Sequence, residues 1–241
     1  MNLKNFIRST LIFLRLDLTK NLEYDRLTKL ILKRVVGYNS NCIDVGCHKG
    51  EILDLILKYS PKGKHFAFEP IPYLFNQLEN KFRNRVALYP YALSDKNGNT
   101  TFQLVKNAPA YSGINKRKYA IAHPDIEEIK VELQKLDDVI PREVKIDFIK
   151  IDVEGGEFGV LKGAKELLKR NLPVVIFECG MGASDYYGTN PLDLYNFMVQ
   201  DIGLKIYTLK AFINGNKPLT ASRFEECFKN NSEYYFISTR T

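Results

Sequence analysis

The stretch Asn41–Gly50, NCIDVGCHKG, decides the fold of this chain. Its apolar first half around Ile43 has the composition of a short buried strand, and the glycines that follow Val45 predict a tight turn. Over Glu51–Tyr59 the apolar residues then recur at helical spacing. A strand, a glycine turn and a helix in this order predict the first unit of an open parallel sheet, whose ligands bind beyond the carboxyl ends of the strands.

The spacing of the glycines indicates which ligand this turn accepts. A dinucleotide-binding turn needs G-x-G-x-x-G, but His48 stands where the middle glycine would be, so the pattern is D-x-G-x-x-x-G. The chain also lacks G-K-S or G-K-T after this strand, which excludes a triphosphate P-loop. A turn that keeps Gly46 and Gly50 and admits side chains between them suits S-adenosylmethionine, whose amino-acid end is small. The alternative is an ordinary strand-to-helix turn with glycines at cap positions.

A second acidic residue at a strand end favours the interpretation of the turn as an S-adenosylmethionine site. Asp44 lies at the end of the first strand, and a second apolar run over residues 65–68 ends in Glu69. A carboxylate at the end of the second strand is where a ribose diol is bound in sheets of this kind. The two signals together predict an S-adenosylmethionine site.

The composition, with 45% hydrophobic and 26% charged residues, is that of an ordinary soluble globular protein. At 241 residues the chain fits one α/β domain, residues 38–241, after an N-terminal helical extension, residues 1–37. The net charge of +7 comes from dispersed lysines, so it fits either an anionic partner or a solvated surface. The cysteines form no C-x-x-C pair and are typical of free thiols in the cytoplasm: Cys42, Cys47, Cys179 and Cys227.

Residues 1–20 have the pattern of a basic amphipathic helix. Their apolar stretch Leu11–Leu14 is too short for a signal peptide, and no run in the chain approaches the roughly 20 apolar residues of a membrane span. Three roles stay open: a helix packed on the domain, a dimer contact, and a peripheral helix on an anionic membrane surface. We therefore expect a cytoplasmic protein, with contact to the inner membrane surface as the open alternative.

The rest of the chain supplies further strands and helices. Val86–Leu93 is predicted as the third strand, and Pro90, which has no N–H to donate, assigns that strand to a sheet edge. Thr101–Val105 and Ile129–Leu133 are predicted as two short additional strands. The later strands are predicted at residues 146–153, 173–177, 204–209 and 234–238, and helices at 22–36, 70–82, 157–168 and 190–202.

Three acidic residues follow the fourth and fifth predicted strands: Asp152, Glu154 and Glu178. In a doubly wound sheet the first and fourth strands are neighbours, so these carboxylates should share one crevice with the glycine turn. We predict that they are catalytic, either as general bases toward an alcohol or as oxygen ligands of Mg²⁺ or Mn²⁺. The alternative is that Asp152 and Glu154 only cap the following helix.

The segment Lys106–Pro124 has no clear periodicity and is polar, aromatic and basic. A loop of this length inside a compact domain is usually functional or disordered, and we interpret it as facing the substrate. Its candidate acceptor-binding residues are Tyr111, Ser112, Lys116, Arg117, Lys118 and His123. The three consecutive basic residues would suit an acceptor that carries phosphate or carboxylate.

Four segments between residues 41 and 180 carry a family resemblance: CIDVGCHKGE, HFAFEPIPYLFNQLENKF, YALSDKNG, and FIKIDVEGGEFGVLKGAKELL followed by PVVIFECG. They resemble the FkbM-type S-adenosylmethionine-dependent methyltransferases. The resemblance implies a Rossmann-like class I methyltransferase sheet of order 3-2-1-4-5-7-6. It also implies O-methylation of a hydroxyl on a sugar, glycan, glycolipid or secondary metabolite.

The same resemblance implies roles for the cofactor-binding residues. Asp44, Gly46 and Gly50 would shape the methionine end of the site, Glu69 would bind the ribose, and Ser94 and Asp95 would lie near the adenine. Cys47 and His48 belong to the same turn, where the family usually has Ala-Asn, so the role of His48 is open.

Two other functions stay open. A nucleic-acid 2′-O-methyltransferase would account for the basic charge, but the lysines are dispersed and no RNA-binding motif is visible, so we expect no nucleic-acid partner. A non-catalytic module would bind the cofactor without needing the three carboxylates. We expect a small-molecule or glycan acceptor.

Overall fold

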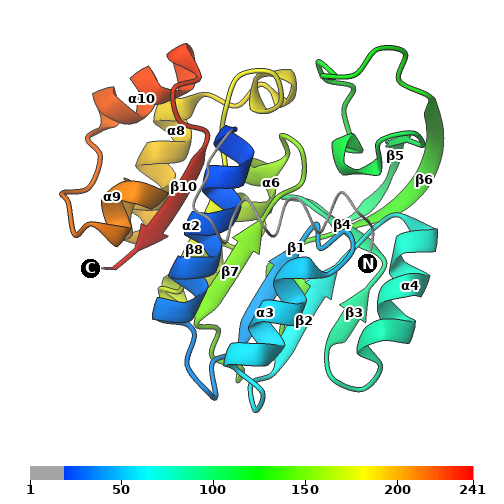
Figure 1. Cartoon of the computed structure of the whole chain (residues 1–241), viewed down its shortest axis with the longest axis horizontal. Helices are drawn as coiled ribbons and strands as arrows, with labels where there is room; N and C mark the ends of the chain where they lie inside the picture. Colours follow the sequence, from blue (N-terminus) through cyan, green and yellow to red (C-terminus); the bar gives the residue numbers. More distant parts are fainter. Residues whose placement is uncertain (1–18, 241) are drawn as a thin grey trace.

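The computed structural model describes residues 19–240, and a seven-stranded sheet runs through its centre (Figure 1). β1 (Cys42–Val45) lies between β2 (His65–Phe68) and β7 (Phe148–Ile151), and both pairings are parallel. The outer strands are β3 (Ala87–Tyr89) beyond β2, and β8 (Val174–Glu178), β10 (Tyr235–Thr239) and β9 (Lys205–Thr208) beyond β7. Numbered in chain order within this sheet, the strands lie 3-2-1-4-5-7-6, so the predicted order is confirmed.

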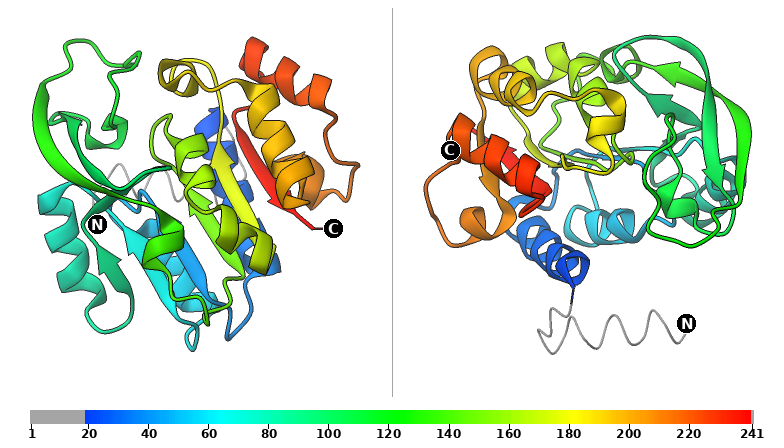
Figure 2. Two further views of the ribbon diagram at one scale, coloured as in Figure 1. Left: turned by 180° about the vertical axis from the view of Figure 1, so that it is seen from behind. Right: turned by 90° about the horizontal axis from the view of Figure 1, so that it is seen from above.

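Helices cover both faces of the sheet (Figures 1 and 2). One face is covered by α2 (Lys20–Val35), α3 (Glu51–Tyr59), α4 (Pro72–Phe82) and α9 (Leu209–Ile213). The other face is covered by α5 (Leu136–Val139), α6 (Glu157–Lys162), α7 (Lys165–Asn171), α8 (Pro191–Asn196), η3 (Phe197–Ile202) and α10 (Ala221–Asn230). Both faces of the central strands are therefore buried, and their residues are mostly apolar, with the buried exceptions Asp44, His65 and Lys150.

The helix α2 confirms the prediction over residues 22–36. The hydroxyl of Thr19 accepts a hydrogen bond from the Leu22 N–H (3.3 Å), which caps the helix, and Leu27 and Ile31 are buried against the sheet. The amphipathic helix predicted for residues 1–20 lies, except for its last two residues, outside the described residues. Within residues 19–240, no helix is long and apolar enough to cross a membrane.

The strand predicted over Val86–Leu93 is divided at Pro90. Its first part is β3, which is the edge strand that the proline predicted, and its second part is β4 (Tyr91–Leu93). β4 leaves the central sheet and pairs with β6 (Ile126–Gln134), which in turn pairs with β5 (Gly98–Val105). The two short strands predicted near residues 101–105 and 129–133 are thus longer than expected and form a second, three-stranded sheet.

The helix predicted over residues 157–168 is interrupted at Gly163. A Cβ atom at this position would collide with the carbonyl oxygen of Ser94, so a glycine is required where the two segments touch. α7 then starts afresh, because both carboxylate oxygens of Asp137 accept hydrogen bonds from its first turn, from Glu166 N (2.9 Å) and Leu167 N (2.8 Å). Asp137 belongs to α5, a short helix that the sequence did not predict.

The carboxyl-terminal part closes the sheet as predicted. Asn190 caps α8 by accepting a hydrogen bond from Leu192 N (2.9 Å), and β9 and β10 form an antiparallel pair. α10 was not predicted, although Phe224, Cys227 and Phe228 recur on one buried face at helical spacing.

The turn after β1 contacts the end of β7 at Gly46, and a substitution of Gly46 can test this contact. Its φ angle is +75°, and a Cβ would collide with the Asp152 carbonyl oxygen. We expect Gly46→Ala to lower the free energy of unfolding by about 3 kcal/mol or more in urea titrations, through backbone strain plus overpacking. Gly203→Ala is the matched control, since Gly203 has φ +89° and open space around its Cβ position, so only the strain of about 1–2 kcal/mol should appear. Equal losses in the two variants would contradict the contact.

Candidate active site

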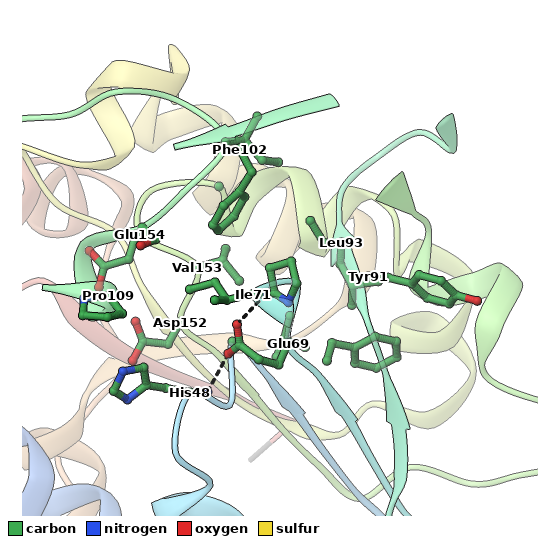
Figure 3. A pocket seen from close by; sticks show the side chains of 18 of the residues that line it. His48, Glu69, Ile71, Tyr91, Leu93, Phe102, Pro109, Asp152, Val153 and Glu154 are labelled. Carbon is green, nitrogen blue, oxygen red and sulfur yellow. Dashed lines mark hydrogen bonds between the residues drawn. The ribbon is translucent and has the colours of Figure 1, made fainter. Parts of the chain in front are cut away.

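A cavity opens beyond the carboxyl ends of β1, β2 and β7, and its empty space is about 600 Å³ when the part open to solvent is included (Figure 3). Its floor is formed by the strand ends, including Gly46, Glu69 and Asp152, and one wall is formed by Tyr91, Leu93 and Phe102 of the second sheet. The second sheet therefore serves as an apolar wall of the site.

The glycine turn after β1 is built by backbone hydrogen bonds and left-handed residues. Both Gly46 N (3.0 Å) and Cys47 N (3.2 Å) donate to the carbonyl oxygen of Phe68, which ties the turn to the end of β2. Gly50 has φ +73° and precedes α3, packed so closely on Phe82 that a Cβ would collide with the ring. Of the residues predicted for this turn, Gly46 and His48 line the cavity, while Asp44 and Cys47 are buried and Gly50 shapes the backbone.

Glu69 lies at the end of β2 with its carboxylate in the cavity (Figure 3). Its Oε2 accepts a hydrogen bond from His48 N (2.8 Å), and its Oε1 accepts one from Ile71 N (3.0 Å). Burial nevertheless raises the pKa of Glu69 to about 7. Each oxygen keeps a further lone pair, so the side chain is fixed and still able to accept hydrogen bonds from a diol.

His48 adopts φ +47°, which is uncommon for a residue with a side chain. Its ring lies beside Asp152 at the edge of the cavity (Figure 3), and its Nε2 atom is buried without a hydrogen-bond partner among the described residues. Burial and the charge of Lys49 lower the pKa of His48, so the ring is neutral near pH 7. An orphaned polar atom at a cavity wall fits a site in which a bound ligand supplies the missing partner.

Asp152 is held by two partners from different strands. Its Oδ2 accepts hydrogen bonds from Lys150 Nζ (2.8 Å) and from Tyr235 Oη (2.7 Å). Burial alone would raise the pKa of Asp152, but the charge and the hydrogen bonds of these partners outweigh it and lower the pKa below the usual value. Both bonds use Oδ2, so Oδ1 is the oxygen available to a ligand in the cavity.

Lys150 is itself buried and lies opposite Asp44 in the register of β7 and β1. Burial would lower the pKa of Lys150, but the charges of Asp152 and Asp44 raise it instead. Asp44 is less well compensated: its carboxylate accepts no hydrogen bond from the described residues, and burial raises its pKa to about 6. The strand ends thus share one buried positive charge between two carboxyl groups.

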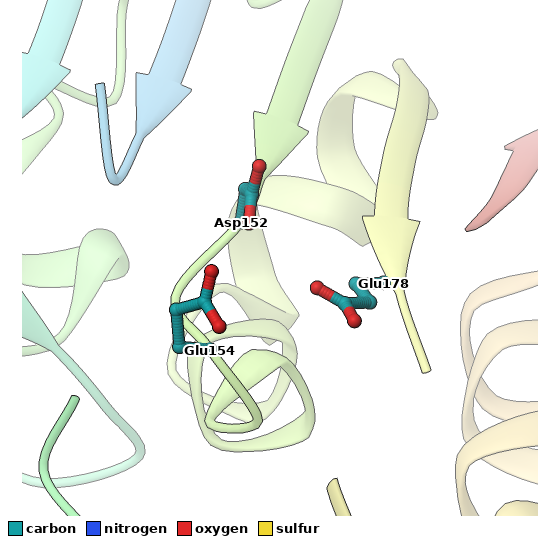
Figure 4. Close-up of side chains that lie close together, drawn as sticks. All are labelled: Asp152, Glu154 and Glu178. Atoms are coloured by element: carbon teal, nitrogen blue, oxygen red, sulfur yellow. The ribbon is translucent and has the colours of Figure 1, made fainter. Parts of the chain in front are cut away.

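The carboxylates of Asp152, Glu154 and Glu178 lie together as predicted (Figure 4). Each offers an oxygen within 4.8 Å of the others. Asp152 and Glu154 line the cavity, whereas Glu178 lies one strand away, at the end of β8. Burial, followed by the charges of Glu157 and Asp152, raises the pKa of Glu178 well above its usual value.

The helix-cap interpretation of Asp152 and Glu154 does not fit the geometry. Gly156 precedes α6 without any side-chain capping bond, and Glu157 accepts hydrogen bonds from Val153 N (2.9 Å) and Gly155 N (3.2 Å). Burial raises the pKa of Glu157 to about 7. The N–H groups of Val153 and Gly155 therefore donate to Glu157, and the carboxylates of Asp152 and Glu154 do not cap the helix.

A divalent metal ion would compete with cations that the site already holds. Lys150 pairs with Asp152, and Arg117 pairs with Glu154, so two of the three carboxylates face a positive side chain. A metal ion at these carboxylates therefore stays a prediction.

The predicted substrate loop contributes unequally to the site. Ser112 lines the cavity and accepts a hydrogen bond from Val105 N (2.9 Å), and Arg117 reaches Glu154 while stacking over the ring of Tyr111, 5.5 Å from its centre. The remaining candidates lie away from the cavity: Lys116 pairs with Glu128 (3.5 Å), and Lys118 and His123 are exposed.

The two predicted adenine-side residues also lie outside the cavity lining. Leu93 lines the cavity, but Ser94 and Asp95 follow it away from the cavity, and Asp95 pairs with Lys162 (2.7 Å). That ion pair, with a smaller contribution from burial of opposite sign, lowers the pKa of Asp95.

Several residues of the site were not predicted. Lys150 could have been found from the sequence, because a lysine inside the apolar run IDFIKIDV must be buried with the strand and needs a carboxylate partner. Glu157 had the signal of an acidic residue in a first helical turn. Tyr235 and Phe102 had none, since each is an ordinary strand residue until the sheets are assembled.

Comparison with known proteins identifies the family of this chain. The model of the "Methyltransferase FkbM domain" matches residues 44–206, which is more than half of the chain. The chain belongs to the FkbM methyltransferase family. Membership of a methyltransferase family implies S-adenosylmethionine as the methyl donor, and the glycine turn, Glu69 and the orphaned His48 nitrogen fit such a ligand.

Two relatives illustrate the similarity. The "2-O-methyltransferase NoeI" of Sinorhizobium fredii is 29% identical over 142 residues, which are 53% of this chain and 58% of that protein. The chain thus spans somewhat more than half the length of this curated relative. A methyltransferase FkbM from Methylobacillus flagellatus has the same class I fold, with a TM-score of 0.51, 15% identity, and coverage of 84% of this chain and 44% of that one.

The raised pKa of Glu69, about 7, predicts a pH-dependent cofactor affinity. Glu69 is protonated below that pH and ionised above it, and only the carboxylate accepts charge-assisted hydrogen bonds from both ribose hydroxyls. We expect Glu69→Ala to weaken S-adenosylmethionine binding by about 1–3 kcal/mol at pH 8, and by less at pH 6, in isothermal calorimetry. Comparison with the variant at each pH cancels the titration of the cofactor's own amino group. A constant difference between native protein and variant over this range would contradict the assignment.

The buried charge of Lys150 can be tested by its removal. We expect Lys150→Met to lower the free energy of unfolding by about 3–5 kcal/mol at pH 8, because it leaves Asp44 and Asp152 buried without a cation. The loss should shrink toward pH 5, where these carboxyl groups are more easily protonated. Lys145→Met is the control: its 3.0 Å pair with Asp147 involves an exposed side chain and should be worth about 1 kcal/mol or less.

Proposed function

We propose that the protein is an S-adenosylmethionine-dependent O-methyltransferase that methylates a hydroxyl of a sugar, glycan, glycolipid or secondary metabolite. The supporting observation is that the carboxylates of Asp152 and Glu154 line the same cavity as Glu69 (Figure 3). A site for the donor and candidate proton acceptors thus adjoin each other. The name of the relative NoeI, a 2-O-methyltransferase, agrees with transfer to oxygen.

In this proposal the residues at the strand ends position the donor. Glu69 binds the ribose hydroxyls, the turn that contains Gly46 and His48 surrounds the methionine end, and the apolar wall with Phe102 excludes water. When bound, S-adenosylmethionine supplies a methyl group on a sulfonium, whose departure as a neutral thioether needs little covalent help. Alignment of donor and acceptor can then contribute several of the roughly 7–11 kcal/mol that orientation makes available.

The acceptor hydroxyl has to lose its proton during the transfer. Asp152 is the carboxylate that Lys150 and Tyr235 hold in the ionised form, and Glu154 lies beside it. A carboxylate in this position acts as a general base, which is worth about 10²–10⁴ in rate. Glu178 is the least suited of the three, since burial raises its pKa well above the usual value and so favours the protonated form.

The four cysteines are free thiols and all are buried. Free thiols are typical of reducing compartments, which supports a cytoplasmic location as part of this proposal.

The decisive experiment is mass spectrometry of candidate acceptors after incubation with protein and S-adenosylmethionine. Cell-envelope glycans, glycolipids and small metabolites should include one class that gains the mass of one methyl group. Calorimetry of S-adenosylmethionine binding accompanies it, and native protein that releases no heat with the cofactor would refute the proposal.

The three carboxylates should respond differently to amide substitution. We expect Asp152→Asn and Glu154→Gln to lower kcat by about 10²-fold or more, the loss expected for a general base. Glu178→Gln should stay within a few-fold of the native kcat, because a glutamine resembles the protonated acid. Circular dichroism and cofactor calorimetry check that each variant is folded.

A mechanism that uses a metal ion predicts a different response to these substitutions. Activity would then fall with a chelator and return with Mg²⁺ or Mn²⁺, and Glu178→Gln would be as damaging as the other two substitutions. Near-native turnover in all three variants would leave catalysis to alignment alone.

A further inference from the structure

We propose that Arg117 is the receptor for an anionic group on the acceptor, and that it exchanges Glu154 for this group when the acceptor binds. The inference rests on the proposed function, since it concerns the acceptor of the same reaction. It assigns the acceptor to a chemical class: a hydroxyl compound that carries a carboxylate or a phosphate.

The first argument is the position of Arg117. The loop that carries it is anchored two residues earlier, where Asn115 N donates to Tyr187 Oη (3.0 Å) and Asn115 Nδ2 donates to the Tyr186 carbonyl oxygen (3.1 Å). From this anchor the Arg117 side chain, only 12% exposed, lies over the ring of Tyr111 and reaches Glu154 at the cavity. The guanidinium is therefore held at the edge of the site by two neighbouring loops.

The second argument is the surplus of donors on Arg117. A guanidinium has five N–H donors, and in this protein Nη1 is the atom in contact with Glu154, while Nε is buried without a hydrogen bond to any of residues 19–240. Glu154 is the one carboxylate within ion-pair distance among these residues. Buried donors without acceptors are costly, and a planar guanidinium binds carboxylate or phosphate through two parallel hydrogen bonds. The Nε–H is thus a donor that Glu154 leaves unused and that an anionic group replacing Glu154 can engage.

The third argument is that Arg117 alone of the three consecutive basic residues pairs with a residue that lines the cavity, Glu154. Lys116 pairs with Glu128 on β6, and Lys118 is exposed. A general attraction of the loop for anions would not require this difference. One arginine paired with a carboxylate of the cavity instead indicates a defined position for one anionic group.

The exchange has a consequence for the chemistry. Glu154 adopts φ +62°, an uncommon conformation that keeps its carboxylate close to Asp152 and Glu178 (Figure 4). Once Arg117 has moved to the acceptor, Glu154 faces like charge without its cation, which favours the uptake of a proton. The acceptor hydroxyl then gives its proton to Glu154, its oxygen forms the bond to the methyl carbon, and the carbon–sulfur bond breaks to leave a neutral thioether.

The test measures anion binding in the absence of turnover. Protein saturated with S-adenosylhomocysteine is titrated by calorimetry with glucuronate, glucose 6-phosphate and neutral glucose. Four forms are compared: native protein, Arg117→Gln, Glu154→Gln, and Arg83→Gln as the matched control. Arg83 is an exposed arginine just beyond α4, outside the cavity.

We expect Glu154→Gln to bind at least one of the two anionic sugars about fivefold or more tightly than native protein, because the arginine no longer has a competing carboxylate. Arg117→Gln should weaken that binding about tenfold or more, and Arg83→Gln should leave it within twofold of native. If glucuronate binding depends on Arg117, the anionic group is a carboxylate, and if glucose 6-phosphate binding does, it is a phosphate. Glucose should show no dependence on Arg117.

Two results would overturn the proposal: no anion binding by Glu154→Gln at tens of millimolar ligand, or equal binding by native protein and Arg117→Gln. Arg117→Lys guards against a folding defect, since it keeps the charge and should retain part of the affinity. The heat of S-adenosylhomocysteine binding is measured first in every form. Its absence would count against the proposed function, whereas cofactor binding without arginine-dependent anion binding would count only against this inference.

Discussion

The arrangement of the site depends on one buried charge, the ammonium group of Lys150. It donates to Asp152 after β7, Lys150 lies opposite Asp44 of β1 in the strand register, and Tyr235 of β10 supplies a second hydrogen bond to Asp152. A buried cation and its partners have to stay together, because separating them leaves uncompensated charge in a low-dielectric interior. The strand ends that carry the cavity are therefore fixed relative to one another by electrostatics as well as by the sheet.

Left-handed residues then open the space above those strand ends. Gly46, His48 and Gly50 have positive φ after β1, and Glu154 and Gly155 have positive φ after β7. These turns carry the chain sharply away from the sheet, and Glu69 joins them to β2 by accepting the His48 N–H. The result is a cavity whose polar groups are oriented before any ligand arrives, which reduces the cost of binding.

The sequence predicted the fold correctly where a residue type is compatible with few backbone environments, as with buried apolar strand residues, glycine in a turn and proline at a sheet edge. The apolar strands and the Asp44–Gly50 turn predicted the parallel sheet, and Pro90 predicted an edge strand. The second sheet was missed as a unit because Pro90 also allows the chain to leave the first sheet, which only the pairing of β4 with β6 shows.

The residues of the site could likewise be predicted only where strand order alone places them. The meeting of Asp152, Glu154 and Glu178 follows from strand order alone, which the sequence supplied. The partners of these acids do not, because Arg117 and Tyr235 come from distant parts of the chain and their side chains carry no mark of where they will point. Ser94 and Asp95 were assigned to the adenine by resemblance, and the packing of Gly163 on Ser94 turns that segment from the cavity.

The pKa values of the remaining acids suggest how the site tolerates so many carboxyl groups. Burial raises the pKa to about 6 for Asp44 and to about 7 for Glu69 and Glu157, so near neutrality Glu69 and Glu157 are partly protonated, which relieves the repulsion among these acids. Asp152 is the exception, since Lys150 keeps it ionised. A carboxylate that stays charged is suited to lie beside a cationic donor. When transfer consumes that positive charge, a carboxylate that takes the acceptor's proton loses its negative charge in the same step. The net charge of the cavity is then unchanged by the reaction, so a buried site of low dielectric constant needs no counter-ion to enter or leave.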